Sequence, residues 1–270
     1  MSGFFIKTSK STTIRKKPVF MYICCQEKFN KTIMKNQILK TIFSLLTLLS
    51  ILSCSNSDSN GNSNQNLSQV PLAKSQYDNS NFGIYKGVFV GSSGTIILDL
   101  SNSTNSFTAT LIIDGVTHNF ITNQAIQQNQ TTTINFVEGS NSFTFTVSAN
   151  GGNPTITNLI INGHPNAALL VVKETSTVLI KCFEGTFSGT YSGTFNAVIY
   201  GNIIKGISRE TSDENIVTAD GTVNNNQINA SGNASNGAVF IGNLSSNNFS
   251  GTWSRTSDNA NGTFTGVRTY

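Results

Sequence analysis

Few side chains in this sequence of 270 residues could act as general bases or bind metals. An imidazole can do both, but only His118 and His164 carry one, and neither has a second potential ligand at short spacing. His118 falls on the apolar face of an expected hairpin, and His164 precedes Pro165 in the sequence NGHPN. We therefore expect a partly buried, hydrogen-bonded His118 and a loop position for His164. No metal site and no cofactor are predicted.

Paired carboxylates are the remaining catalytic possibility, because glycosidases use two carboxyl groups that flank a cleft. Asp114 and Asp220 each precede a glycine, a combination typical of tight turns. The sequence SRETSDENI, residues 208–216, is expected to form a solvated loop. We therefore predict no catalytic residues and no enzymatic activity. The carboxylates considered are Asp99, Asp114, Glu138, Glu174, Glu184, Glu210, Asp213, Glu214, Asp220 and Asp258.

Motifs of other catalytic classes are missing from the sequence. It contains no Gly-x-Ser-x-Gly elbow and no Gly-Lys dipeptide of a phosphate-binding loop. From residue 54 onward the cysteines are Cys54 and Cys182, which excludes a Cys-x-x-Cys redox or zinc motif in that part of the chain. Trp253, the single tryptophan, is expected in the core rather than as a platform for a sugar ring.

The positive charge of the chain is concentrated near its N-terminus. The formal net charge is +4, but nine basic residues and only one acidic residue precede Cys54. From Cys54 onward there are eight basic and twelve acidic residues, which gives a net charge of −4. Because nucleic-acid-binding proteins carry a basic patch or stripe, we expect no nucleic-acid partner.

A hydrophobic segment precedes Cys54 and ends abruptly there. Lys35 and Lys40 are followed by the apolar sequence IFSLLTLLSIL, then by Ser53 and Cys54. This apolar segment is shorter than the roughly 20 residues that a membrane-spanning helix needs. Its length and flanking charges are those of a secretory signal peptide. A short membrane anchor or a buried helix is the alternative.

The sequence from Met34 to Cys54 resembles the lipobox signal peptide of bacterial lipoprotein precursors. An aliphatic residue stands three positions before the cysteine and a small residue directly before it. The resemblance implies removal of residues 34–53, acylation of Cys54, and a lipid anchor in the cell envelope. Ser55 rather than aspartate after the cysteine implies the outer membrane. Residues 1–33 would be a disordered upstream extension or would not be translated.

Residues 54–81 are polar and are expected to form a flexible tether between the lipid anchor and the folded part, with a packed N-terminal arm as the alternative. From Phe82 onward, apolar and polar residues alternate with period 2, which indicates half-buried β-strands. We predict an all-β, antiparallel meander of small barrel or sandwich units. The expected boundaries are 82–183 and 184–270, or one β domain over 82–270.

Turn signals and a glycine repeat support this prediction. Turns are expected at Asp114-Gly115 and Asp220-Gly221, and at four Asn-Gly pairs that begin at residues 150, 162, 236 and 261. The sequence FEGTFSGTYSGTF, residues 183–195, places an aromatic residue at every fourth position with glycines between. If the segment stays extended, Phe183, Phe187, Tyr191 and Phe195 share one side. A structural role in a strongly curved sheet is favoured over a binding strip.

Three functions are consistent with these features. The favoured one is a membrane-anchored, non-catalytic lipoprotein that binds an unidentified small molecule or protein through its β scaffold. A structural or adhesive envelope module, which pairs through an exposed sheet edge, is the alternative. A glycan-acting hydrolase is the least favoured, since it needs two carboxylates that converge in a cleft.

Overall fold

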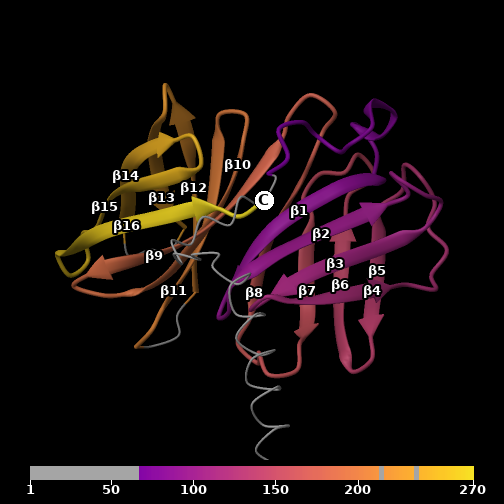
Figure 1. Ribbon diagram of the computed structural model, residues 1–270, viewed down its shortest axis with the longest axis horizontal. Helices are drawn as coiled ribbons and strands as arrows, with labels where there is room; N and C mark the ends of the chain where they lie inside the picture. The colour runs from indigo at the N-terminus through magenta and orange to yellow at the C-terminus, as the bar shows by residue number, and fades with distance from the viewer. Residues whose placement is uncertain (1–66, 213–215, 234–236) are drawn as a thin grey trace, which may run out of the picture. The chain divides into compact units, whose positions relative to one another are not determined.

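The computed structural model describes residues 67–212, 216–233 and 237–270, and within them the protein is all-β and antiparallel, as predicted (Figure 1). One short 3₁₀ helix, η1 (Ser75–Tyr77), precedes the strands. In these residues no helix has the length and apolar composition needed to cross a membrane. The predicted signal peptide, Cys54, and the two candidate carboxylates Asp213 and Glu214 lie outside the described residues.

The first sheet has eight strands in the order β7-β6-β5-β4-β3-β2-β1-β8. It is barrel-like but open, since its edge strands β7 and β8 lie near each other without pairing, and a single residue pair, Ile121 with Val137, joins β4 to β5. The strands are β1 (Gly83–Val90), β2 (Gly94–Leu100), β3 (Phe107–Ile113), β4 (Val116–Ile121), β5 (Thr132–Glu138), β6 (Asn141–Val147), β7 (Thr155–Ile160) and β8 (Ala168–Lys173).

The second sheet is a closed barrel in the order β10-β11-β12-β13-β14-β15-β16-β9. Its strands begin after residues 174–179, so Phe183, the expected last residue of the first unit, lies in the barrel. The strands are β9 (Ile180–Gly189), β10 (Gly193–Tyr200), β11 (Ile203–Glu210), β12 (Ile216–Asn224), β13 (Gln227–Gly232), β14 (Ala238–Ser245), β15 (Asn248–Arg255) and β16 (Ala260–Arg268).

The apolar residues of the alternating sequence pattern form two aromatic cores. In β6, Asn141, Phe143, Phe145 and Val147 are buried while the residues between them are partly exposed. Phe136 stacks on Phe143 inside the first sheet, with ring centroids 5.1 Å apart. Aromatic pairs of this kind contribute beyond the area they bury. The barrel has a separate core of phenylalanines and Trp253, which is 6% exposed, as predicted for a core residue.

The inside of the barrel is filled by its own side chains. Phe195 stacks on Phe240 with centroids 4.8 Å apart and an interplanar angle of 7°, and it meets Phe249 and Phe264 edge-on. An eight-stranded barrel has an interior just wide enough for such a filling. The closed barrel is therefore a packed core rather than a container.

A third hydrophobic cluster joins the two sheets. Val88 and Val90 of β1 pack with Val198 of β10 and Ile207 of β11, and this explains why every residue of β1 is buried. Asn196 Nδ2 donates a hydrogen bond to the carbonyl oxygen of Phe89, 2.5 Å away. Cys182 lies in the same cluster, and burial raises the pKa of its thiol to about 12. The first sheet and the barrel thus share a continuous apolar contact.

The N-terminal segment from residue 67 is docked on the folded part, although the predicted tether extended to residue 81. The backbone N–H of Leu72 donates to Glu174 Oε1 at 2.6 Å, and that of Lys74 donates to Asn102 Oδ1 at 2.9 Å. Asn81 is fully buried and hydrogen-bonds to Thr132. Residues 67–81 therefore form a packed arm, the alternative to a flexible tether over this part.

At two of the predicted turns the residues lie inside a strand instead. Asp114 and Gly115 form the expected tight turn with φ of 48° and 79°, but Asp220 and Gly221 lie inside β12, and the turn that follows uses Asn225 and Asn226 with φ of 48° and 66°. Gly221 is needed for close packing, because a Cβ there would clash with the carbonyl oxygen of Asn229. The Asn-Gly pair at 261 likewise lies inside β16, where a Cβ on the glycine would meet the Trp253 ring nitrogen.

The glycine–aromatic segment does not stay extended. It turns between Gly189 and Gly193 and forms the β9–β10 hairpin. Even so, Phe183 and Phe195 are buried in the barrel core, and Phe187 and Tyr191 pack against it. The contacts of these four aromatic rings thus indicate a structural role.

Candidate functional site

A cavity of about 630 Å³ lies between the loops at one end of the first sheet and strands β10 and β11 of the barrel. Its size is within the range of small-molecule sites, about 300–1,000 Å³. Both sheets contribute to it, which places it where the shared apolar contact ends. The lining residues fall in three groups: the β1–β2 and β3–β4 turns (residues 91–93 and Asp114), the β7–β8 loop (residues 163–166), and the barrel (Thr194 and residues 209–211).

Backbone conformation explains how three loops reach this cleft. Gly91 has φ of 86°, which turns the chain directly after β1, and a Cβ there would lie 2.5 Å from the carbonyl oxygen of Asn166. Gly163 has φ of 81° in the β7–β8 loop. Glycine adopts such positive φ values without steric cost. The close approach of the β1–β2 turn to the β7–β8 loop therefore depends on Gly91.

The hydroxyl group of Thr194 has no partner. Among the described residues, Thr194 Oγ1 and Thr269 Oγ1 are the buried side-chain polar atoms without a hydrogen bond. Thr194 lines the cleft, whereas Thr269 lines a second cavity of about 450 Å³ beside Glu184. Buried polar atoms are nearly always satisfied by protein, water or ligand. The unsatisfied hydroxyl of Thr194 thus marks a point where a polar ligand atom or a water can bind.

Ser92, His164 and Asp114 meet at one wall of the cleft, a set of side chains similar to a serine hydrolase triad. Ser92 Oγ is hydrogen-bonded to His164 Nδ1, and Asp114 Oδ2 lies 3.6 Å from the same nitrogen. A triad places the serine on Nε2 and the carboxylate on Nδ1, so that the two nitrogens have different tasks. Because both oxygens approach Nδ1, these residues form a hydrogen-bonded wall without relay geometry.

Asp114 is held in its ionised form by the neighbouring turn. The backbone N–H of Ser93 donates to Asp114 Oδ1 at 2.9 Å, and Ser93 Oγ donates to the same atom at 3.2 Å. These hydrogen bonds, with the nearby His164, hold the pKa of the Asp114 carboxyl below its usual value. The side chain remains 49% exposed, so it can also accept hydrogen bonds from a ligand.

The barrel wall of the cleft carries one cation and one anion, both already paired. Arg209 Nη1 donates to the carbonyl oxygen of Asn166 at 2.5 Å and so connects β11 to the β7–β8 loop. Glu210 Oε2 lies 3.9 Å from Arg255 Nη1, and the Glu210 side chain is only 11% exposed. The expectation of a solvated loop is therefore wrong for Glu210, which ends β11 and faces Arg255 at the end of β15.

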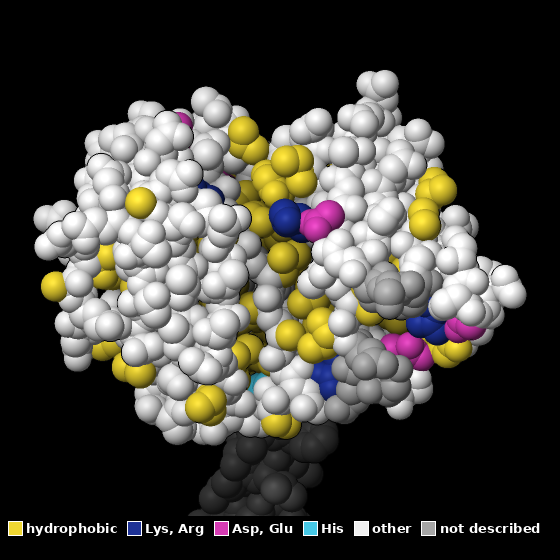
Figure 2. All heavy atoms as spheres, turned by 180° about the vertical axis from the view of Figure 1, so that it is seen from behind, with side chains coloured by type: hydrophobic (Ala, Val, Ile, Leu, Met, Phe, Trp, Pro, Cys, Tyr) yellow, Lys and Arg dark blue, Asp and Glu magenta, His cyan; other side chains and the backbone are white. Residues whose placement is uncertain are grey.

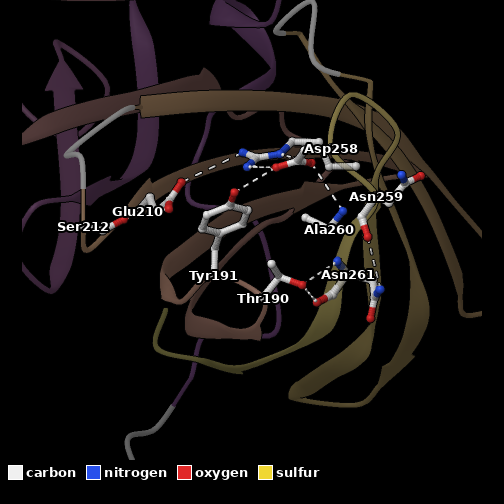
Figure 3. Close-up of polar contacts among 9 residues, drawn as sticks. Thr190, Tyr191, Glu210, Ser212, Asp258, Asn259, Ala260 and Asn261 are labelled. Carbon is white, nitrogen blue, oxygen red and sulfur yellow. Dashed lines mark hydrogen bonds and ion pairs between the residues drawn. The ribbon is translucent and has the colours of Figure 1, made fainter.

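Arg255 belongs to a network that supports this wall from behind (Figure 3). Its guanidinium donates two hydrogen bonds to Asp258, at 3.0 and 2.7 Å, and lies 4.3 Å from the centre of the Tyr191 ring. Tyr191 and Asp258 point toward each other and share a hydrogen bond of 2.9 Å. The Arg255 guanidinium, with the Tyr191 hydroxyl, holds the pKa of Asp258 far below its usual value. Glu210 is thus positioned by a guanidinium that is itself fixed.

The other predicted residues lie in separate structural contacts. His118 Nδ1 is 2.7 Å from Glu138 Oε2, and its side chain is 21% exposed, as predicted. His164 lies in the β7–β8 loop, also as predicted.

Asp99 accepts hydrogen bonds from the backbone after β2, Asp220 pairs with Lys205, and Glu174 is buried beside Lys86. Burial raises the pKa of Glu184 in the second cavity. In the described part of the chain, no group of three or more His, Cys, Asp or Glu side chains could hold a metal ion.

The carboxylates of the cleft do not form a glycosidase pair. Asp114 and Glu210 both line it, but one of the two carboxyl groups of a glycosidase must be protonated. The pKa of Asp114 is lowered, and Glu210 is ion-paired with Arg255. The cleft therefore has acceptors and donors for binding.

Sequence reasoning missed Ser92, Thr194, Arg209 and Asn166. They come from four segments between residues 91 and 211. Thr194 lies in the glycine–aromatic repeat of residues 183–195, to which a structural role was assigned, and the other three belong to no spaced motif. The glycines on either side of Ser92 and Ser93 gave a local signal for a turn, but not for what it would meet. No protein family model matches the chain, and a search of curated proteins finds no match.

Proposed function

We propose that this protein is a lipoprotein, anchored to the cell envelope through acylated Cys54, whose folded part binds a polar ligand in the cleft between the first sheet and the barrel. The observation that carries the binding role is the cavity of about 630 Å³, lined in part by hydroxyl and charged side chains, with the unpartnered Thr194 hydroxyl in its wall. The lipobox-like sequence before Cys54 supports the anchor and the outer-membrane location. The protein has no catalytic role and no nucleic-acid partner in this proposal.

The cleft is favoured over the barrel interior as the place of binding. Phenylalanines occupy the interior in close ring contacts, so a ligand there would have to displace them. Figure 2 shows one face of the molecule, where hydrophobic side chains gather in the middle. The cleft offers space without any rearrangement of the two aromatic cores.

A binding role is also favoured over an adhesive one. Pairing with a partner strand would need a regular, exposed sheet edge. Edge strand β7 is short and irregular, because Asn158 has φ of 51° and the register with β6 shifts at this point. Bulged edge strands of this kind resist pairing with other chains. The structural or adhesive alternative therefore has less support than the cleft.

The anchor is tested by metabolic labelling with radioactive palmitate. The full-length chain should incorporate label and partition with membranes, and Cys54→Ser should do neither. Label that persists in Cys54→Ser would contradict the proposed site of acylation.

Ligand binding is tested by native mass spectrometry of the mature protein, purified gently from its own membranes. We expect an additional mass that is lost on denaturation. Thr194→Val should retain less of it than the wild type, whereas Thr252→Val, on the exposed face of β15, should not differ. The bare mass of the acylated chain in every sample would count against a bound ligand.

A further inference from the structure

The charged side chains around the cleft are each bound by another group of the protein. Two carboxylates, Asp114 and Glu210, and one guanidinium, Arg209, line it, and Arg255 lies directly behind Glu210. Arg255 also donates two hydrogen bonds to Asp258, so its charge is shared between two carboxylates. Each of the three groups that line the cleft has a protein partner: Ser93 for Asp114, Asn166 for Arg209 and Arg255 for Glu210. A charged ligand would have to compete with these internal contacts, so the wall favours an uncharged ligand.

The groups that remain for a ligand are hydroxyls, carbonyls and an exposed carboxylate. Thr194 and Thr211 bring hydroxyls to the cleft, and Asp114 brings an exposed carboxylate. The hydroxyls of Ser92 and Ser93 also line it, but they are already hydrogen-bonded to His164 and Asp114 and offer a ligand only their remaining positions. A hydroxyl group can donate one hydrogen bond and accept two. A ligand rich in hydroxyl groups matches such a wall, since each ligand hydroxyl can accept from one protein group and donate to another. The unpartnered Thr194 Oγ1 requires a partner of this kind.

The cleft has little to offer an apolar ligand. Pro165 is the bulky apolar side chain in its lining, and no aromatic ring lines it. An acyl chain would find no cluster of large aliphatic or aromatic side chains there, although contact with such side chains is the main source of affinity for lipids. The lack of an aromatic ring also means that a sugar would be held by hydrogen bonds without stacking.

We infer that the ligand of the cleft is an uncharged saccharide, held by hydrogen bonds to Thr194, Asp114 and the β1–β2 turn. This inference rests on the proposed binding function and narrows its ligand class. An open cleft formed by loops also suits part of a longer glycan chain, because the ends of an oligosaccharide can extend into solvent.

The test uses the mature, acylated protein in detergent and a set of trisaccharides of known charge. Maltotriose, cellotriose, mannotriose and chitotriose are neutral, trigalacturonate is anionic, and the trimer of glucosamine is cationic. Binding is measured by ligand-observed NMR and then by titration calorimetry. We expect at least one neutral trisaccharide to bind, and the two charged ones to bind more weakly.

Variants connect that binding to the cleft. Thr194→Val removes the hydroxyl at nearly constant volume and should weaken binding about three- to tenfold, the effect of one neutral hydrogen bond. Thr194→Ser restores the hydroxyl and should restore most of the affinity, and Thr252→Val should bind as the wild type does. Equal melting temperatures of the four proteins show that the comparison concerns binding rather than folding.

The outcomes separate the inference from the function on which it rests. Preference for a charged trisaccharide, or equal binding by Thr194→Val and wild type, would overturn the inference. If no trisaccharide binds but native mass spectrometry detects a bound ligand, the saccharide class is wrong and the binding function stands. If neither experiment detects a ligand, both fail.

Discussion

Lys86 Nζ lies 2.5 Å from Glu174 Oε2, and both side chains are completely buried. Glu174 also accepts hydrogen bonds from the backbone N–H groups of Leu72 and Ile180, at 2.6 and 3.1 Å. The pair thereby connects β1, the N-terminal arm and the start of the barrel. The Lys86 ammonium further lies 4.8 Å from the centre of the Tyr270 ring, next to the C-terminus. One buried ion pair therefore holds together segments from both ends of the described chain.

Loss of one partner of this pair should be strongly destabilising. Glu174→Gln keeps the shape and one acceptor but leaves the Lys86 ammonium buried without a counter-charge. Breaking a buried ion pair in this way costs about 3–5 kcal/mol. The free energy of unfolding, measured by urea titration, should fall by about that amount.

The double variant Lys86→Met/Glu174→Gln is the control for this reading. It removes both charges, so no uncompensated ion is left in the core. We expect it to be more stable than Glu174→Gln alone. A double variant that is less stable than the single one would show that the ion pair is not the source of the effect.

Ser92 should not react as an activated nucleophile. Its hydroxyl and the Asp114 carboxylate both approach Nδ1 of His164, so the imidazole cannot be oriented by one while it deprotonates the other. Incubation of the wild-type protein with a fluorophosphonate probe, followed by peptide mass spectrometry, should leave Ser92 unmodified. Stoichiometric labelling of Ser92, abolished in His164→Ala, would favour an enzyme over a binding protein.

Gly185 should not tolerate a side chain. It pairs with Gly266 across the β9–β16 ladder, and a Cβ there would clash with the carbonyl oxygen of Thr265 and lie 2.7 Å from Gly266 Cα. Because both obstacles are backbone atoms, Gly185→Ala should lower the free energy of unfolding by about 1–3 kcal/mol. Gly152→Ala is the matched control, since its Cβ would meet only the flexible Asn150 side chain at 3.1 Å. Similar losses of stability for the two variants would contradict the steric explanation.

The contribution of Lys173 to stability should rise with pH in the range where it titrates, whereas the buried Cys182 thiol, whose pKa is raised to about 12, acts in the opposite direction. Lys173 Nζ donates to the carbonyl oxygens of Ser80 and Phe82, and burial lowers its pKa to about 8 from 10.5. Between pH 8 and 10 the unfolded chain keeps a proton that the native protein has released, so a higher pH favours the native state. Above pH 10 the buried Tyr85, whose pKa is raised, reverses the trend.

Urea titrations at pH 7.5, 8.5 and 9.5 measure this effect against Lys173→Met. The wild type should gain stability across the series relative to the variant. The result that contradicts this is a free energy of unfolding of the wild type that falls relative to Lys173→Met over these pH values. It would indicate that Lys173 remains protonated in the native state.

The sequence was sufficient for the class of fold and insufficient for the site. Period-2 alternation identified the strands, and Asp114-Gly115 identified a tight turn, because both signals act within a few residues. The turn predicted at Asp220-Gly221 was wrong for a physical reason. Gly221 is required because a neighbouring strand approaches closely, and a local sequence pattern holds no information about that strand. The cleft was not predictable, since Ser92, Asn166, Thr194 and Arg209 meet only through the packing of β1 against the barrel.

The most direct measurement is a crystal structure of the mature protein purified from its own membrane with whatever ligand it retains. The account predicts electron density of a polar, non-protein molecule in the cleft, within hydrogen-bond distance of Thr194 Oγ1 and bounded by the β1–β2 turn and β11. Ordered water alone in the cleft, or a ligand bound elsewhere, would contradict the proposed site.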